Sequence, residues 1–284
     1  MQLKYHQCMR IIDGRKIRDE IILELSEKIK RKLTLAVLSS PSNEASTSYV
    51  KGIRKISEKL KVEVKEYILE KHSDFESKIE ELNKDKKING ILLLLPLPED
   101  VDFKKLQKKI SPEKDVEGIS PLSFSRFYSG EKKFAPIVSL SVLEIIKRYK
   151  INIKNKTVGI LGHSPVIGRP ISILLLQEFV FSHPHILLIN IGEKNFKKLT
   201  KISDLLIVAV GKPEFLKKDM IKKGSTIVDI GINFVNGKIK GDVHFEDVKN
   251  KVSLITPVPG GVGPVVNAIL FKKLFLLSKI QKDT

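Results

Sequence analysis

The chain has 284 residues, 42% hydrophobic and 30% charged, and its 51 basic against 33 acidic residues leave a net charge of +18. This length and balance are typical of a globular protein with two domains. Residues 1–10 contain no apolar segment of a secretory signal, and the longest aliphatic run, Ile91–Leu95, is too short to span a bilayer. The single cysteine, Cys8, excludes an internal disulfide and supplies no metal-binding set. We expect a cytoplasmic protein without a membrane contact or a metal.

The positive charge has two interpretations. It could attract polyanions, either nucleic acid or a phosphorylated cofactor and a polycarboxylate substrate. However, the basic residues are scattered over every predicted helix, with no interleaved aromatic residues and no nucleic-acid motif. This scatter favours a lysine-rich surface, and no nucleic-acid partner is expected.

The first half of the chain alternates apolar runs of strand length with amphipathic segments of helix length. Loops are indicated by composition at 39–45 and around 114–119. The pattern predicts strands at 33–38, 62–69 and 89–96, and helices at 12–31, 46–60 and 74–84.

The second half continues the alternation. We expect a helix near 139–149, a series of strands and helices over 157–256, and a last helix at about 265–280. Strands that alternate with helices predict an α/β protein with parallel sheets covered by helices on both faces. No linker-like stretch marks the domain boundary, which we place near 139–150.

The stretch from Thr157 to Pro170 reads TVGILGHSPVIGRP. A short apolar run, Thr157–Leu161, is followed by Gly162 and Gly168, which bracket a turn, and Pro170 suits the first turn of a helix. The order of strand, glycine turn and helix presents free N–H groups to a phosphate. The G-x-G-x-x-G spacing is absent, so an ordinary strand–helix turn is the alternative.

Three later stretches support a nucleotide site. Residues 204–213 and 225–233 are apolar runs that reach a glycine where a strand should end, the edge at which open α/β sheets bind ligands. Residues 256–264 read TPVPGGVGP, which is too rich in glycine and proline for a helix or a strand. With these motifs the chain resembles the bifunctional methylenetetrahydrofolate dehydrogenase/methenyltetrahydrofolate cyclohydrolase family over nearly its whole length.

The resemblance implies a fold and an activity. The expected fold is an N-terminal α/β lobe for folate binding and catalysis over 1–140, against which a C-terminal helix, 265–284, packs. A Rossmann-like NAD(P)-binding lobe follows at 141–264, with a cleft between the lobes. The implied reaction is oxidation of 5,10-methylenetetrahydrofolate by NADP, with NAD as the alternative cofactor, followed by hydrolysis to 10-formyltetrahydrofolate. The implied partners are tetrahydrofolate derivatives and a second copy of the chain in a homodimer.

Folate-side residues follow from the family's motifs. Tyr49 matches the tyrosine of S-x-x-Y-V and is expected against the folate ring. Asp115 lies in KDVEG, where the family has K-D-V-D-G, and is expected to hold the N–H groups of the pterin. Pro259, Gly260 and Gly261 belong to the nearly intact glycine loop and are expected to contact the substrate. A later threonine of the family is Val266.

Two positions depart from the family together. The catalytic lysine expected four residues after the tyrosine is Ile53, and its glutamine partner is Leu94. Because an unpaired buried glutamine is costly, this paired loss indicates a repacked pocket. Without a lysine at 53, we expect cyclohydrolase activity to be absent or very low.

The cofactor motif is also altered. The resemblance implies binding by Gly162, His163, Ser164, Gly168, Ile191 and Ile232. His163 replaces an arginine that suits a 2′-phosphate, and Ile191 replaces a serine. No carboxylate ends the strand before Ile191, so ribose recognition is left to Asn190 or Glu193.

These departures leave two alternatives to the bifunctional enzyme. One is a dehydrogenase without cyclohydrolase activity that prefers NAD. The other is a non-catalytic relative that binds folate or a nucleotide. Titration with NADP, NAD and a folate analogue, followed by turnover assays, distinguishes them.

Overall fold

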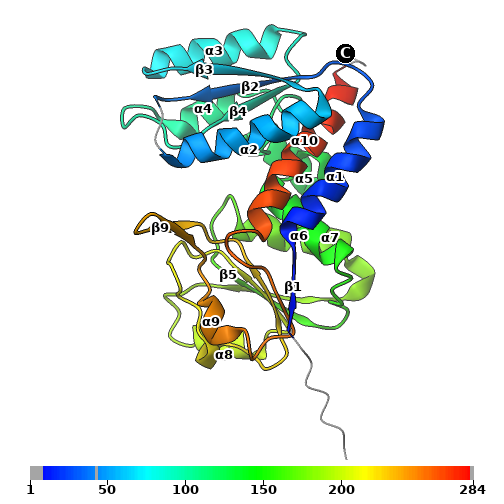
Figure 1. Ribbon diagram of the computed structural model, residues 1–284, viewed down its shortest axis with the longest axis vertical. Helices are drawn as coiled ribbons and strands as arrows, with labels where there is room; N and C mark the ends of the chain where they lie inside the picture. The colour runs from blue at the N-terminus through cyan, green and yellow to red at the C-terminus, as the bar shows by residue number, and fades with distance from the viewer. Residues whose placement is uncertain (1–8, 42–43, 282–284) are drawn as a thin grey trace, which may run out of the picture. The chain divides into compact units, whose positions relative to one another are not determined.

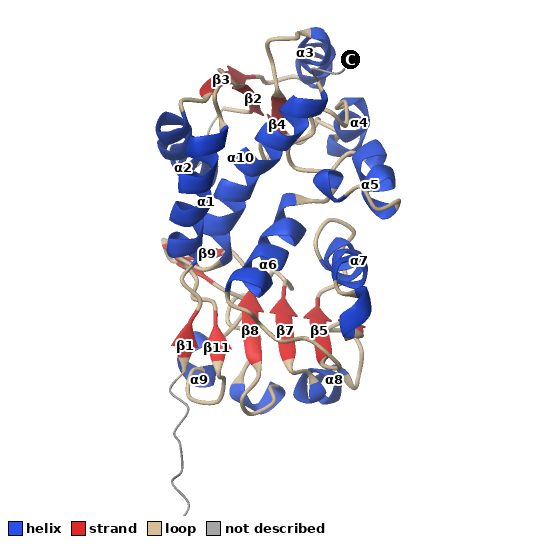
Figure 2. Ribbon diagram, turned by 90° about the vertical axis from the view of Figure 1, so that its right-hand side faces the viewer, coloured by secondary structure: helices blue, strands red, loops and turns tan. Residues whose placement is uncertain are grey.

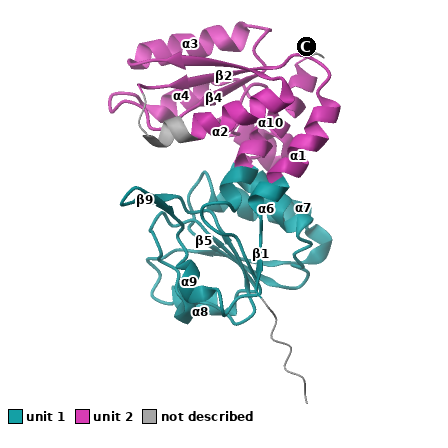
Figure 3. Ribbon diagram, in the orientation of Figure 1, with its two compact units in different colours: residues 1–17, 138–265 teal, residues 18–137, 266–284 magenta. Residues whose placement is uncertain are grey.

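The computed structural model describes residues 9–41 and 44–281, without the side chains of 44–48. Cys8 therefore lies outside the described residues. The chain forms two compact units, Met1–Ile17 with Val138–Val265 (unit 1) and Arg18–Ile137 with Val266–Thr284 (unit 2) (Figure 3). The expected first lobe, 1–140, included the N-terminus. In the structure the first residues group with unit 1 instead, because β1 (Arg10–Ile11) pairs in parallel with β11 (Leu254–Ile255).

Unit 1 contains a six-stranded parallel sheet in the order β1-β11-β8-β7-β5-β6. Figure 2 shows β1, β11, β8, β7 and β5 side by side, with their arrowheads at the same edge. The chain passes from β5 to β6 on one side and then returns to β7 on the other. The remaining strands are β5 (Thr157–Leu161), β6 (His185–Ile189), β7 (Leu205–Val208) and β8 (Thr226–Asp229).

The central strands of this sheet are apolar because both faces are covered. Leu206, Val208 and Ile227 are fully buried and belong to one core cluster. A two-stranded antiparallel hairpin is attached to unit 1 and consists of β9 (Asn233–Val235) and β10 (Lys238–Lys240). The helical segments that lie wholly or mostly in unit 1 are α6 (Ile137–Arg148), α7 (Gly168–Glu178), η2 (Val180–Ser182), α8 (Phe196–Ile202), η3 (Lys218–Met220) and α9 (Phe245–Val248).

Unit 2 contains a three-stranded parallel sheet in the order β3-β2-β4 (Figure 1). Its strands are β2 (Thr34–Ser39), β3 (Glu63–Ile68) and β4 (Gly90–Leu93). A core cluster that includes Leu38, Phe75, Ile79 and Leu93 packs one side of this sheet. The helical segments that lie wholly or mostly in unit 2 are α1 (Gly14–Lys28), α2 (Glu44–Leu60), α3 (His72–Lys84), α4 (Phe103–Lys109), α5 (Pro121–Tyr128), η1 (Lys132–Phe134) and α10 (Val262–Ile280).

The α/β class and the parallel sheets predicted from the sequence are confirmed. Two helices were not predicted, α4 and α5, although each has a side-chain cap. Asp102 accepts hydrogen bonds from the N–H groups of Lys104 and Lys105, and Ser120 accepts one from Ser123. In the part of the chain that the structure describes, no helix is long and apolar enough to cross a membrane. The same residues contain no cluster of three or more His, Cys, Asp or Glu side chains arranged to hold a metal ion.

Candidate active site

The turn between β5 and α7 brings Gly162 and Gly168 together. Gly162 has a φ of 109°, and its N–H donates to the Ile189 carbonyl at 3.0 Å. A Cβ at Gly162 would lie 2.1 Å from the Ala209 carbonyl oxygen, and one at Gly168 would lie 1.9 Å from the carbonyl oxygen of Gly162. Both positions therefore require glycine. No side chain caps the amino end of α7, so this end can present its N–H groups to a phosphate.

The residues between these glycines have local roles. Ser164 Oγ accepts a hydrogen bond from the Ile167 N–H at 3.2 Å, which closes the turn. His163 is exposed, and its carbonyl accepts a hydrogen bond from Arg169 Nε at 3.1 Å. The Arg169 side chain thus lies over the turn and is exposed. It is a cation on the glycine turn itself.

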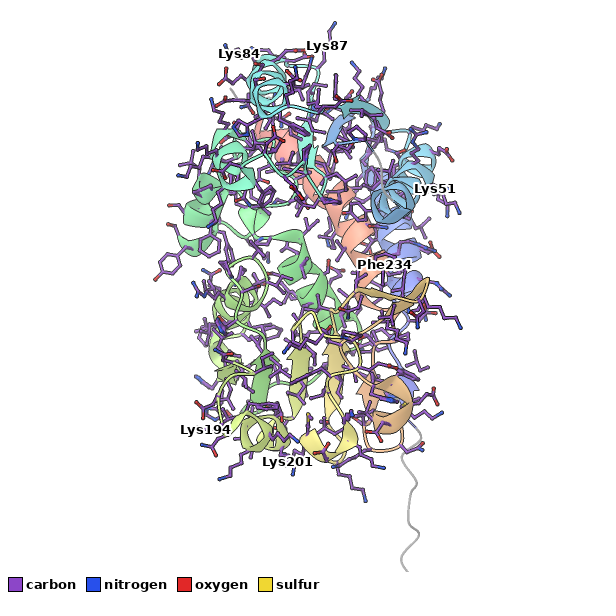
Figure 4. The ribbon with its side chains drawn as sticks, turned by 90° about the vertical axis from the view of Figure 1, so that its left-hand side faces the viewer. Lys51, Lys84, Lys87, Lys194, Lys201 and Phe234 are labelled. Atoms are coloured by element: carbon purple, nitrogen blue, oxygen red, sulfur yellow. The ribbon has the colours of Figure 1, made fainter. Side chains whose placement is uncertain are left out.

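The end of β6 carries the other cofactor candidates. Ile191 is half-buried and packs against the core of unit 1. Asn190 Oδ1 accepts from the Gly192 N–H at 2.9 Å, and Glu193 Oε1 accepts from the Asn195 N–H at 3.0 Å, so both polar side chains hold this loop. Lys194, in the same loop, is exposed and points away from the ribbon (Figure 4). Ile232, which follows β8, is 58% exposed.

The glycine loop after β11 packs on the start of α1. The Gly14 N–H donates to the Gly260 carbonyl at 3.0 Å, and a Cβ at Gly14 would lie 1.7 Å from the carbonyl oxygen of Gly261. Gly260 has a φ of 113° and faces the guanidinium of Arg15. Pro259 precedes it in the chain. The loop is therefore held by backbone contacts that only glycine allows.

Helix α2 of unit 2 carries Tyr49 and Ile53 one turn apart. Tyr49 is half-buried, and its pKa is raised by burial and then by the nearby Glu117 carboxylate. Ile53 is fully buried. Gly52, between them, faces the side-chain amide of Asn267 from α10. Leu94 is buried and donates its N–H to the Leu38 carbonyl at 2.8 Å, extending the β2–β4 pairing by one residue. Both positions at which the family motif has a polar residue are thus apolar and buried.

Asp115 is buried, and its carboxylate holds its own loop. Oδ1 accepts from the Gly118 N–H and Oδ2 from the Ser120 N–H, both at 2.8 Å. Both oxygens are therefore already engaged by the backbone. The geometry gives Asp115 a structural role in its own loop.

Half-buried Glu117 and almost fully buried Lys273 form an interacting ionisable pair, and Glu117 also interacts with Tyr49. No hydrogen bond joins the Glu117 carboxylate to any other side chain or backbone group that the structure describes. Burial raises the pKa of Glu117 to about 8, with a further rise from Asp115 that Lys273 opposes. Lys273 is 1% exposed, and burial lowers its pKa to about 8 against the attraction of Asp115 and Glu117.

Neither residue of this pair was selected from the sequence. The signal for Glu117 was present, since the second acidic residue of KDVEG differs from the family's aspartate. The signal for Lys273 was its spacing, because it lies three residues after Leu270 and four before Leu277, both fully buried on α10. A lysine at this spacing falls on the apolar face of the helix.

Family models match the chain in two segments. Residues 12–117 match the catalytic domain of tetrahydrofolate dehydrogenase/cyclohydrolase, and residues 136–282 match its NAD(P)-binding domain. The chain belongs to the tetrahydrofolate dehydrogenase/cyclohydrolase family.

Members of this family are similar to the chain over its whole length. The bifunctional protein FolD of Dictyoglomus thermophilum is 36% identical over 282 residues, which cover 96% of this chain and 98% of that protein. The crystal structure of the bifunctional FolD enzyme of Campylobacter jejuni has a TM-score of 0.90 and 35% identity, covering 96% of this chain and 99% of that one. The FolD enzyme of Trypanosoma brucei, solved with NADP and an inhibitor, has a TM-score of 0.89 and 25% identity, covering 97% and 99%.

Proposed function

We propose that this tetrahydrofolate dehydrogenase/cyclohydrolase oxidises 5,10-methylenetetrahydrofolate with NADP and hydrolyses the methenyl product slowly to 10-formyltetrahydrofolate. The observation that carries the proposal is the match of both family domains to the chain, together with a glycine turn at the carboxyl edge of the unit 1 sheet. Relatives named as bifunctional FolD proteins support the pairing of the two activities.

Unit 1 fits a dinucleotide. Gly162 and Gly168 let the turn close tightly on the neighbouring backbone, and the uncapped amino end of α7 supplies N–H donors for a pyrophosphate. NADP, when bound, accepts a hydride. The turn residues hold the cofactor in place, and Arg169 is the cation available for a phosphate. Because positioning is the protein's main contribution to hydride transfer, this step needs few reactive side chains.

Unit 2 supplies the folate-side groups. Tyr49 offers a ring for stacking, and Glu117 offers a carboxylate without a hydrogen-bond partner among the described residues. Asp115 holds the loop that presents Glu117. Pro259, Gly260 and Gly261 of unit 1 are proposed to contact the substrate through their backbone. The apolar Ile53 and Leu94 provide no proton carrier, so the hydrolytic step is the weaker one.

Two assays test this function. NADPH formation from 5,10-methylenetetrahydrofolate reports the dehydrogenase, and the loss of 5,10-methenyltetrahydrofolate absorbance reports hydrolysis. Turnover in the first assay with slow turnover in the second is expected. Turnover in the first without any in the second indicates a dehydrogenase alone. Binding of NADP and folate without turnover in either assay indicates a non-catalytic relative.

We further infer that the protein is a cytoplasmic homodimer. The inference rests on the family resemblance.

A further inference from the structure

The amine of Lys273 is held deep in unit 2 by backbone carbonyls. Lys273 Nζ donates to the carbonyl oxygens of Ala135 at 2.8 Å and Phe134 at 3.3 Å. It packs against Gly118, where a Cβ would lie 2.4 Å from Nζ. Placing an ammonium group in the interior is costly. A methionine would fill the same space at less cost, so the lysine is not explained by packing.

Glu117 interacts with both this amine and Tyr49. Its neighbour Gly118 contacts Nζ, its carboxylate interacts electrostatically with both Lys273 and Tyr49, and its backbone carbonyl accepts from the Ile137 N–H at 3.0 Å. The residue is half-buried, whereas Lys273 is almost completely buried. Glu117 is therefore the member of the pair that a substrate can reach.

Three elements bring charged or titratable groups to Glu117. Tyr49 comes from α2, Asp115 from the same loop, and Lys273 from α10. Burial brings the pKa of Glu117 and that of Lys273 to about 8 each. Groups with pKa values near the working pH are the ones suited to proton exchange.

We propose that Glu117 exchanges the proton required for methenyl hydrolysis, and that Lys273 is the positioning residue that sets the charge of Glu117, in place of a lysine at position 53. This inference rests on the proposed function. It assigns the residual hydrolysis to a pair contributed by two segments far apart in the chain.

Methenyl hydrolysis through Glu117 conserves atoms and electrons. A water oxygen forms a bond to the methenyl carbon, and the proton lost from that water goes to the Glu117 carboxylate. The bond between this carbon and N5 then breaks, its electron pair stays on N5, and Glu117 returns its proton to N5. The remaining hydroxyl proton leaves to solvent as the formyl C=O forms, so one water is consumed and one proton is released.

The test uses the full-length enzyme and three lysine variants. Lys273→Met removes the amine, and Lys273→Arg keeps a fixed charge. Lys279→Met is the matched control, an exposed lysine on the same helix. Hydrolysis and NADPH formation are measured at saturating substrate between pH 5.5 and 9, after subtraction of the rate without protein.

Lys273→Met should slow hydrolysis at pH 7 tenfold or more while hydride transfer is retained. The pH at which hydrolysis is half-maximal should rise from about 8 to 9 or above, so that the rate of this variant is still increasing at the upper end of the range, because an opposite charge near a carboxyl favours its ionised form. Lys273→Arg should return the pH of half-maximal hydrolysis toward that of the unmodified enzyme. Lys279→Met should have the same rate and the same pH profile as the unmodified enzyme. Glu117→Gln should lower hydrolysis about 10²-fold or more.

A second measurement does not depend on turnover. The carboxyl ¹³C signal of Glu117, assigned by its loss in Glu117→Gln, should titrate at higher pH in Lys273→Met than in the unmodified protein. An unchanged titration or an unchanged pH profile overturns the inference, as does hydrolysis no faster than the rate without protein. Absence of NADPH formation in the unmodified enzyme would instead overturn the proposed function.

Discussion

Position 53 is fully buried in unit 2, so the effect of a lysine there depends on whether it has a partner. On a helix, residues 49 and 53 lie within about 40° of each other, whereas Lys51 and Lys55 point about 160° away from position 53. Neither lysine can serve in its place without rotation of the helix. Arg54 lies about 100° away and is engaged by Glu66 at 2.7 Å.

The double substitution Ile53→Lys with Leu94→Gln should therefore raise methenyl hydrolysis. General acid–base help is worth about 10²–10⁴-fold, so the gain should lie in this range. Ile53→Lys alone should bury an unpaired charge and destabilise the fold. Hydrolysis assays and urea denaturation of the three proteins check this. Hydrolysis by the unmodified enzyme as fast as by relatives that carry the lysine would contradict the argument from Ile53.

The raised pKa of Glu117 also predicts how the free energy of unfolding depends on pH. Its pKa is raised from 4.5 to about 8 in the folded protein, so its stabilising contribution is complete below about pH 4.5 and is lost as the pH rises toward 8. Glu117→Gln should remove this loss, up to about 1.4 kcal/mol per pH unit. The free energy of unfolding in urea at pH 5, 6.5 and 7.5 measures the difference.

The exposed Glu99→Gln serves as its control. Parallel pH dependences for Glu117→Gln and the unmodified protein would show that Glu117 is ionised over the whole range.

The β5–α7 turn depends on two glycines as one element. Gly168→Ala would place a Cβ 1.9 Å from the carbonyl oxygen of Gly162, a backbone atom that cannot move aside cheaply. We expect a loss of about 1–3 kcal/mol in the free energy of unfolding, with weaker NADP binding. Gly263→Ala, at a helical position with open space around it, should be close to neutral. Equal stability of the two variants would contradict this packing.

The β5–α7 turn and the end of β6 carry the two residues expected to discriminate between NADP and NAD. With His163 and Ile191 at the positions expected to hold a 2′-phosphate, we predict weak discrimination. Loss of a charge-assisted hydrogen bond costs about 1.5–3 kcal/mol, tenfold or more in affinity. His163→Arg with Ile191→Ser should raise the preference for NADP, measured by calorimetry with both cofactors. A strong preference in the unmodified protein would point to Arg169 or Lys194 as the phosphate partner, and Arg169→Ala then tests it.

At the scale of the whole molecule, the +18 charge is spread over the surface. Lys51, Lys84, Lys87, Lys194 and Lys201 are exposed, come from both units, and point away from the ribbon (Figure 4). This distribution is that of a solvated lysine-rich surface.

The proposed homodimer is tested at this scale. Light scattering at micromolar concentration should give twice the chain mass of 32.1 kDa. The mass is measured at two salt concentrations, because a strong net charge opposes association at low ionic strength. A mass of one chain at both would refute the dimer.

The sequence by itself determined the features that depend on neighbouring residues. Alternating apolar runs and amphipathic segments predicted the parallel α/β class, and the glycines at 162 and 168 predicted the turn before α7. These features follow from backbone preferences and from burial of a periodic face, which a window of a few residues contains. The caps at Asp102 and Ser120 were equally local signals, and α4 and α5 were missed because those caps were not used.

Only the tertiary structure decided which side chains share an environment. Asp115 was chosen from its motif, yet its oxygens bind the backbone of its own loop, and Glu117 two residues later has the carboxylate without such partners. Lys273 comes from more than 150 residues later in the chain to lie next to Gly118 and interact with Glu117, and β1 pairs with β11 across most of the chain. Charge, burial and pKa depend on these distant neighbours, because desolvation and Coulomb attraction act through space and not along the sequence.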